Sequence, residues 1–213
     1  MKAAGWRGSR EVWLEAALEA LVEGGVDAVK IQPLASRLNL SRTSFYWFFK
    51  DRKALLDALV DAWNSKNTGG LVSMAEAYAE TPAEAVLNVI SAFLDDALFD
   101  PRLDFAVRGW ALQAPDLMAR VNAADESRLA ALRGMLERHG YDPDDADVRA
   151  RTMYLVQIGY IAMQVRESLA TRMKRIPGYV KTFSGQAPGE RELARFFARH
   201  GYDPPNEMNV EEA

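Results

Sequence analysis

Basic and aromatic residues are concentrated in one short stretch of the chain, "NLSRTSFYWFFKDRK", at residues 39–53. Five consecutive aromatic residues occupy positions 45–49. Four basic residues flank them: Arg42, Lys50, Arg52 and Lys53. On a helix, five successive rings point in all directions, so some of them cannot face the core of the protein. Because basic side chains bind phosphates, this stretch is a candidate site for a polyanion.

The distribution of charge supports a polyanion partner at the N-terminal end. The net charge of −4 would, taken alone, argue against nucleic acid. Residues 1–56, however, carry nine basic and six acidic residues, whereas the remainder carries 17 basic and 24 acidic residues. A basic quarter on an acidic body is the asymmetry expected when one end of a protein meets a polyanion.

Residues typical of an enzyme active site are scarce. There is no cysteine, so disulfides, thiolate metal sites and cysteine nucleophiles are excluded. The two histidines, His139 and His200, both lie in the repeated sequence "RHGYDP", which is typical of a helix end followed by a new helix. Carboxylate pairs such as Asp95–Asp96 occupy adjacent helix positions and point apart. We therefore expect no enzyme, no metal site and no cofactor.

The elements that position these residues are predicted to be helices almost throughout, because no segment alternates with a period of two over the length of a strand. Capping and breaking residues place the predicted helices near 9–25, 31–38, 42–48, 51–63, 81–99, 101–112, 115–139, 143–171 and 189–200. The fourth helix is expected to lose regularity at "NTGG". Helix 143–171 is predicted to be the longest.

The aromatic stretch divides into two faces when residues 42–48 are helical. Phe45, Phe48 and Phe49 share one face, while Tyr46 and Trp47 point away from it, with Thr43 between them. The alternative is that Tyr46 and Trp47 pack on neighbouring helices.

The two helices flanking Asn39 form a predicted helix-turn-helix. Asn39 tolerates a left-handed backbone, and Ser41 can cap the second helix. That helix would present Arg42, Thr43, Ser44, Tyr46 and Trp47.

The segment "LASRLNLSRTSFYWFFKDRKALLDAL" resembles the DNA-binding domain of the TetR family of bacterial repressors, a resemblance that covers about residues 9–63. Asn39 replaces the glycine usual in the family, and Arg52 replaces its usual lysine. The resemblance implies an all-α protein. It would consist of a helix-turn-helix domain at 1–56, a linking helix at 51–66, and a helical ligand-binding and dimerisation domain at 67–213.

The resemblance also implies roles for individual residues. Arg42 and Thr43 would reach base edges in the major groove, and Gln32 matches a position that reaches a base in a member of the family. Tyr46 and Trp47 resemble phosphate and sugar contacts. Lys50, Arg52 and Lys53 surround a helix N-terminus that also favours phosphate; the alternative is that they form a solvated face.

For the acidic body, the resemblance implies a homodimer and a small-molecule ligand. Helix 143–171 is apolar on nearly every side, so we expect it to form the dimer surface with the last helix; alternatively it is central in its own domain. The expected ligand contacts are Phe105, Arg108, Trp110, Tyr154, Gln157, Ile158 and Ile161. These residues could instead be core, and Arg108 could simply pair with Asp104 one turn earlier.

The predicted function is that of a DNA-binding transcriptional regulator, a repressor released from a near-palindromic operator by a small molecule. The rival hypothesis is a helical adaptor that docks on another protein through the aromatic helix 42–49. The sequence has no signal peptide and no apolar run long enough to span a bilayer, so we expect a cytoplasmic protein.

Overall fold

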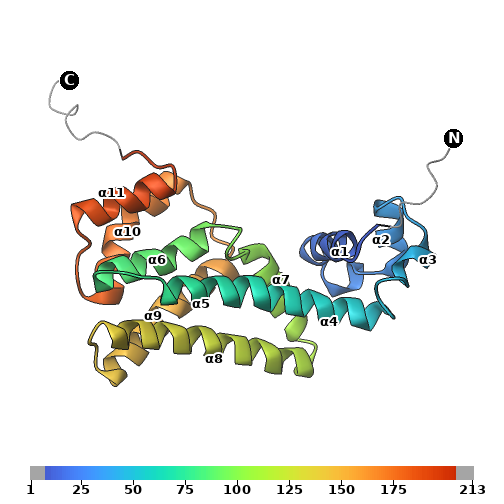
Figure 1. Cartoon of the computed structure of the whole chain (residues 1–213), viewed down its shortest axis with the longest axis horizontal. Helices are drawn as coiled ribbons and strands as arrows, with labels where there is room; N and C mark the ends of the chain where they lie inside the picture. Colours follow the sequence, from blue (N-terminus) through green and yellow to red (C-terminus); the bar gives the residue numbers. More distant parts are fainter. Residues whose placement is uncertain (1–7, 205–213) are drawn as a thin grey trace. The chain divides into compact units, whose positions relative to one another are not determined.

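A computed structural model describes residues 8–204 of the chain, in which every regular element is a helix (Figure 1). The α-helices are α1 (Arg10–Gly24), α2 (Ile31–Arg37), α3 (Arg42–Phe45), α4 (Arg52–Trp63), α5 (Gly69–Glu76), α6 (Pro82–Leu94), α7 (Pro101–Ala111), α8 (Pro115–Arg138), α9 (Pro143–Ala162), α10 (Leu169–Ser184) and α11 (Glu190–Arg199). A short 3-10 helix, η1 (Val26–Ala28), precedes α2, and a π-helix, η2 (Asn64–Thr68), joins α4 to α5. The all-α prediction is confirmed. Within residues 8–204, no helix is long and apolar enough to cross a membrane.

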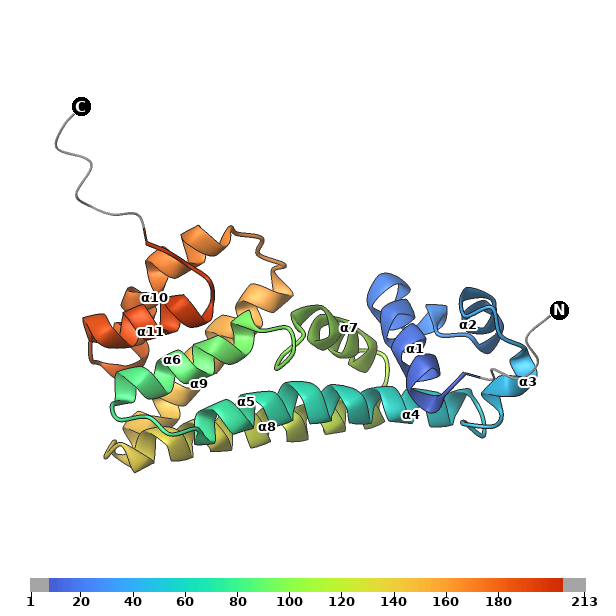
Figure 2. The same cartoon turned by 45° about the horizontal axis from the view of Figure 1, so that its top comes forward.

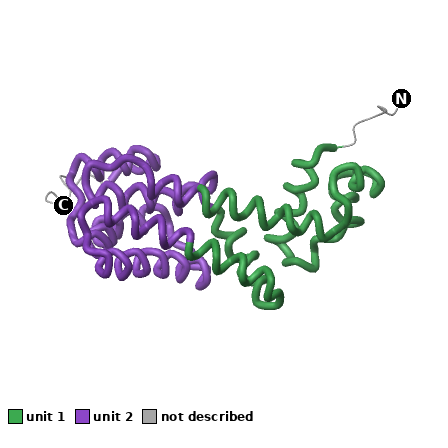
Figure 3. The backbone as a smooth tube through the Cα atoms, turned by 60° about the horizontal axis from the view of Figure 1, so that its bottom comes forward, with its two compact units in different colours: residues 1–69, 100–126 green, residues 70–99, 127–213 purple. Residues whose placement is uncertain are grey.

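The chain divides into two compact units (Figure 3). Unit 1 runs up to Gly69 and also includes Asp100–Glu126; unit 2 consists of Gly70–Phe99 and the chain from Ser127 onward. This division differs from the predicted boundary near residue 66, because α7 and the start of α8 group with the N-terminal helices.

Unit 1 is built around the buried face of α1. Ser9 caps α1 by accepting a hydrogen bond from the Val12 backbone N–H at 3.3 Å, as the sequence predicts. The core of this unit contains Trp13, Leu21, Leu34, Phe45, Phe49, Leu55, Leu59 and Trp63. Helix α7 contributes Leu103, Val107 and Ala111 to the same core.

The turn between α2 and α3 has the predicted backbone. Asn39 has a φ of 53°, a left-handed conformation that asparagine adopts more readily than most residues. The Leu40 N–H donates to the Ala35 carbonyl at 2.9 Å and closes the end of α2. The Ser41 hydroxyl then accepts from the Ser44 N–H at 3.2 Å and starts α3. Helix α3 is shorter than the predicted 42–48, because residues 46–48 form turns after Phe45.

The predicted loss of regularity near "NTGG" takes the form of a π-helix, and the helix does not end there. The chain stays helical from α4 through the π-helix η2 into α5. The π-helix turns Asn67 into the interior of unit 1, where its amide donates to the Asp100 carbonyl and accepts from the Asp100 N–H, both at 3.0 Å. Gly70 is not a stop either. A Cβ at this position would lie 2.1 Å from the Leu98 carbonyl oxygen, so only glycine permits this approach.

Unit 2 surrounds α6, which is buried on most sides from Ala83 to Phe93. Thr81 caps this helix by accepting from the Glu84 N–H at 3.0 Å, with Pro82 at the first helical position, as predicted. Helix α10 packs against both α6 and α9, and α11 packs against α6 (Figure 2).

The prediction of a single helix over 143–171 is wrong. Two helices, α9 and α10, share this part of the chain, and α10 continues to Ser184. Helix α9 ends at Ala162, and Gln164 then adopts a left-handed φ of 51°. Ser168 opens α10 by accepting from the Thr171 N–H at 3.1 Å. The longest helix among residues 8–204 is instead α8, with 24 residues. Helix α10 was missed altogether by the sequence analysis.

Both "RHGYDP" sequences end a helix, as predicted. Gly140 and Gly201 have φ angles of 85° and 62°, and the tyrosine after each donates its backbone N–H back into the preceding turn. In the first copy, Asp142 goes on to cap α9.

Candidate nucleic-acid interface and ligand-site residues

The aromatic stretch anchors α3 in the core of unit 1 through one of its two faces. Phe45 is fully buried and Phe49 is 4% exposed. The Phe45 ring meets Trp13 edge-on with centroids 5.3 Å apart and stacks on Phe49 at 5.5 Å. Phe48 is partly buried against the same core. The predicted inward face is confirmed.

The other face of the stretch is open to solvent. Tyr46 is 48% exposed and Trp47 is 66% exposed, although both are large aromatic residues. Arg42 and Thr43 are exposed as well, and an Arg42 guanidinium N–H donates to the Tyr46 hydroxyl at 3.3 Å. The sequence-based alternative, in which Tyr46 and Trp47 are packed in the interior, does not fit these exposures. Gln32, in the first turn of α2, is also exposed.

Ser44 does not belong with the exposed residues that were predicted to contact DNA. Its side chain is buried, and its hydroxyl donates to the Ser41 carbonyl at 2.7 Å. The prediction that Ser44 is presented on the outer face of α3 is therefore wrong. It lies beside the inward-facing Phe45 and stabilises the start of the helix.

The three basic residues after the aromatic stretch have different environments. Lys50 is exposed. Lys53 is exposed too, but pairs with Asp57 at 2.7 Å, and this hydrogen bond raises the pKa of the Lys53 ammonium. Arg52 is half-buried, and its guanidinium donates to the carbonyls of Val29 and Val26, both at 2.6 Å. Arg52 thus ties the start of α4 to the segment before α2, a structural role that the sequence analysis did not predict.

Together, these side chains form a hydrogen-bonding surface on a rigid support. Helix α3 and the turn after it expose a guanidinium, hydroxyl groups and an indole, and Gln32 and Lys50 are exposed as well. A short exposed helix of this kind can enter a major groove and contact base edges and phosphates.

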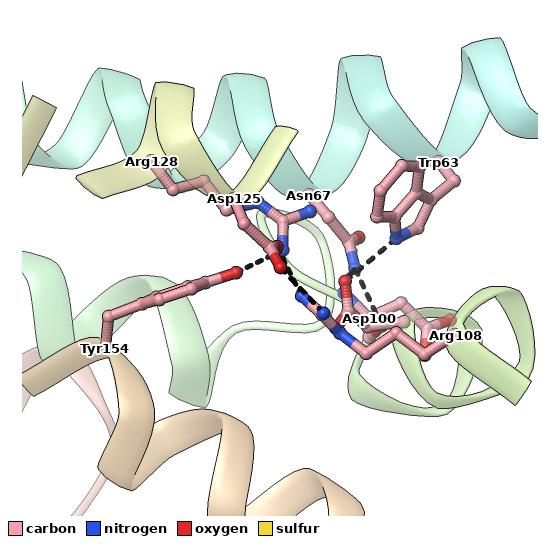
Figure 4. Close-up of polar contacts among 8 residues, drawn as sticks. Trp63, Asn67, Asp100, Arg108, Asp125, Arg128 and Tyr154 are labelled. Atoms are coloured by element: carbon pink, nitrogen blue, oxygen red, sulfur yellow. Dashed lines mark hydrogen bonds and ion pairs between the residues drawn. The ribbon is translucent and has the colours of Figure 1, made fainter. Parts of the chain in front are cut away.

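The predicted ligand contacts on α7 belong to unit 1. Arg108 is already paired: its Nε donates to Asp104 at 2.7 Å, and its two terminal nitrogens donate to Asp125 at 2.9 and 2.6 Å (Figure 4). The hypothesis that Arg108 anchors an anionic ligand is therefore wrong, and the alternative of pairing with Asp104 is confirmed. Phe105 is 41% exposed, and Trp110 packs partly buried on the core of unit 1.

The predicted ligand contacts on α9 belong to unit 2. Tyr154 is 2% exposed, and its hydroxyl accepts a hydrogen bond from the buried Arg128 at 3.0 Å (Figure 4). Tyr154 is therefore a core residue rather than an open pocket wall. Ile158 and Ile161 pack partly buried against the same core. A cavity lies between α6, α9 and α10. Among the four predicted contacts on α9, only Gln157 lines it.

Other polar residues around that cavity were missed by the sequence analysis: Tyr160, Arg172 and Tyr179. Two of them lie on α10, which was not predicted. The signal was nevertheless present, because Ser168 is a good N-cap, and Met173, Ile176, Val180 and Phe183 follow at helical spacing. The hydrogen bond from the Tyr160 hydroxyl, followed by burial, raises the pKa of Tyr179.

The helix-turn-helix and the exposed side chains that follow its turn have the arrangement of a DNA-binding domain. Residues 14–59 match the family of bacterial regulatory proteins named the tetR family. The match covers the helix-turn-helix segment, so it is this part of the chain that resembles the family. The adaptor hypothesis finds no support in the match, and the members of the family are regulators rather than enzymes.

Curated relatives resemble the N-terminal part only. The class A tetracycline repressor protein from transposon 1721 of Escherichia coli is 43% identical over 54 residues, which is 25% of each chain. The class D tetracycline repressor protein of Escherichia coli is 43% identical over 51 residues, 24% of this chain and 23% of the relative. The similarity thus spans only about a quarter of the length of these repressors.

Solved structures resemble nearly the whole chain in fold. AmtR of Mycobacterium smegmatis has a TM-score of 0.63 at 18% identity, covering 96% of this chain and 99% of that one. A transcriptional regulator from Aquifex aeolicus has a TM-score of 0.60 at 18% identity, covering 84% of this chain and 96% of that one. At these identities, the likeness establishes the fold alone.

Proposed function

We propose that the protein is a transcriptional repressor that binds a near-palindromic operator as a homodimer and is released by a small molecule. The observation that carries this proposal is the outer face of α3, where Tyr46 and Trp47 are held exposed beside Arg42 and Thr43. The relatives that share this segment are named as repressors. A bacterial regulator that binds DNA must share a compartment with the DNA, so we propose that the protein is cytoplasmic.

The exposed residues divide into two proposed roles. Arg42 and Thr43, at the start of α3, and Gln32 on α2 would contact base edges in the major groove. Tyr46, Trp47 and Lys50 would contact the sugar-phosphate backbone and set the register of the helix. Lys53 would add positive charge near phosphate, although Asp57 offsets part of that charge. Arg52 contributes mainly by supporting the domain.

Selection of bound genomic fragments by the full-length protein tests the DNA-binding function and supplies an operator for further work. With that operator, Arg42→Ala is expected to lose about 1–3 kcal/mol of specific binding and to relax preference at one base position. Lys50→Ala should weaken binding to all sequences equally and lower the salt slope by about one. Electrophoretic mobility shifts at several salt concentrations measure both effects. Recovery of no enriched fragment, or an affinity that does not change with salt, would contradict the proposal.

The homodimer is proposed to form through α9. Val148 is 63% exposed and Leu155 is 61% exposed, and Ala162 is exposed as well. These residues are spaced by seven along the helix, so they lie on one side of it. A contiguous apolar stripe open to solvent is typical of a protein interface. The last helix, α11, contributes less than predicted, because Phe196 is buried in the core of its own unit.

Leu155→Glu is expected to shift the protein from dimer to monomer, since it places a charge in the centre of this stripe. Two-fold symmetry places two recognition helices in successive major grooves, so the monomer should also lose most of its operator affinity. Sedimentation equilibrium and mobility shifts measure these outcomes. Leu112→Glu is the matched control, because Leu112 is 78% exposed but lies at the end of α7 in unit 1. Equal effects of the two substitutions, or a monomeric wild-type protein, would contradict the proposed interface.

Release by a ligand requires that the ligand bind two conformations with different affinity. A ligand with equal affinity for both shifts nothing, however tightly it binds. We therefore expect the ligand site to involve helices that can change their packing, and the cavity between α6, α9 and α10 is the candidate that we favour in unit 2.

A further inference from the structure

The cavity in unit 2 has an apolar part and a polar part. Its apolar walls come from Ile90, Phe93 and Leu94 on α6 and from Ile176 on α10. Its polar walls come from Gln157 and Tyr160 on α9 and from Arg172 and Tyr179 on α10. A lining that is mostly apolar, with a few convergent polar groups, is the usual composition of a small-molecule site.

Gln157 is an unusual polar residue in this lining. The residue is 9% exposed, and its amide makes no hydrogen bond within residues 8–204, but the amide atoms are not among the buried unpaired polar atoms and so remain accessible to solvent. An amide that reaches solvent and has no protein partner can donate a hydrogen bond to a ligand and accept one from it. Because Gln157 lines the cavity, its amide is available to a ligand that enters there.

Arg172 supplies positive charge at the same place. It is half-buried, its guanidinium lies 5.7 Å from the centroid of the Tyr160 ring, and it forms no ion pair within the described residues. Its neighbour Arg175 pairs with Glu167 instead. With two arginines and one glutamate, the charge of this cluster is positive.

The two tyrosines complete the polar wall. Their hydroxyl oxygens lie 2.9 Å apart, so one of them donates to the other. Tyrosine hydroxyls are ordinarily neutral near pH 7, and the hydrogen bond from Tyr160 raises the pKa of Tyr179 further. The pair therefore adds no negative charge that would oppose an anion.

We infer that this cavity binds the carboxylate group of a small monocarboxylic acid with a hydrocarbon body. The Arg172 guanidinium presents parallel N–H groups that match the two oxygens of a carboxylate, and the Gln157 amide donates a further hydrogen bond. The hydrocarbon body packs against Ile90, Phe93 and Ile176. This inference rests on the proposed function, because it names the chemical class of the ligand that releases the DNA.

The cavity is too small for the proposed ligand unless the surrounding helices change their packing. Its volume is about 20 Å³, which is room for about one water molecule. An acid of several carbons therefore fits only if α10 moves away from α6 and α9. Pro177 lies within α10 and has no backbone N–H, so the helix lacks one internal hydrogen bond at that point and can bend there.

Binding to the full-length protein, measured by calorimetry and by the shift in Tm without DNA, tests the inference. The probes are benzoate and hexanoate, compared with the neutral benzamide and hexanamide. Each acid is expected to bind at least about tenfold more tightly than its amide and to raise the Tm, because a hydrogen-bonded charge pair contributes more than a neutral contact. Arg172→Gln should remove this preference. Arg166→Gln is the matched control, because Arg166 is an exposed arginine of the preceding loop that does not line the cavity.

A second variant, Gln157→Leu, tests the proposed role of the Gln157 amide. Gln157→Leu should weaken benzoate binding at least severalfold and should leave the Tm of the free protein nearly unchanged, because it replaces an amide that has no hydrogen-bond partner among the described residues with an apolar group of similar size. A lower Tm would show that the amide has a structural partner and would overturn its assigned role. The inference is also overturned if the amides bind as tightly as the acids, if Arg172→Gln keeps the preference, or if neither acid binds at millimolar concentration. Operator binding by the protein alone is measured separately, so a failed ligand test does not count against DNA binding.

Discussion

Asp104→Ala is expected to lower the free energy of unfolding by about 3–5 kcal/mol, because it removes one partner from a buried charge pair. Asp104 is completely buried in unit 1. One of its carboxylate oxygens accepts from the Arg108 Nε at 2.7 Å, and the other accepts from the Trp63 indole N–H at 2.9 Å. Asn67 donates to the same oxygen at a longer 3.4 Å. Alanine would leave all three donors without this acceptor in the core of the unit (Figure 4).

Urea denaturation followed by circular dichroism measures this loss. Asp61→Ala is the matched control, because Asp61 also pairs with an arginine, Arg120, at 2.6 Å in the same unit. The Asp61 side chain is 73% exposed, so its removal should cost no more than about 1 kcal/mol. A loss for Asp104→Ala as small as that of Asp61→Ala would show that the buried cluster does not stabilise unit 1.

The cluster also joins the helix that follows the helix-turn-helix to other helices of unit 1. It connects the end of α4 and the π-helix η2 to α7, through Trp63 and Asn67. Asp125 on α8 extends the connection through Arg108. The helix that follows the recognition helix is thus joined to α7 and α8 by hydrogen bonds within one unit.

Local signals made the N-terminal helices predictable from sequence. The positions of Ser9, Asn39, Ser41 and Asp51 are set by hydrogen bonds to residues within three or four positions, so the caps and the turn could be read directly. The division of the aromatic stretch into an inner and an outer face follows from helical geometry alone. The burial of Ser44 could not be foreseen in this way, because it depends on how α3 is tilted against the rest of unit 1.

Features that depend on contacts distant in sequence were not predictable. The π-helix exists where Asn67 pairs with Asp100, more than thirty residues away, and Arg52 reaches carbonyls that precede α2. The extent of α9 was overestimated because apolar residues continue past Ala162, while the break occurs at a left-handed Gln164 that carries no glycine or proline signal. The residues that line the cavity were missed for the same reason. Arg108 and Tyr154 are hydrogen-bonded to other side chains, whereas Arg172 and Tyr179 line the cavity from a helix that was not predicted.

Phe45→Ala and Trp47→Ala are expected to have opposite effects, although both remove a large ring from the same aromatic stretch. Phe45 is fully buried between Trp13 and Phe49, so alanine leaves a cavity in the core of unit 1. Such a substitution costs about 3–5 kcal/mol. Trp47 is 66% exposed, so its removal should cost less than about 1 kcal/mol of stability. If the indole contacts the DNA backbone, Trp47→Ala should instead weaken operator binding for all sequences alike.

Denaturation curves and operator affinities, measured on the same two purified variants, separate these effects. The Phe45→Ala protein should lose its N-terminal helical structure at lower urea concentration than the wild type and bind DNA only to the extent that it stays folded. The Trp47→Ala protein should unfold near the wild-type midpoint and still bind its operator poorly at every salt concentration. If Trp47→Ala destabilises the protein as much as Phe45→Ala does, the ring is a packing residue rather than a DNA contact. In that case the recognition surface must be reassigned to Arg42, Thr43 and Gln32, which lie on the exposed start of α3 and of α2.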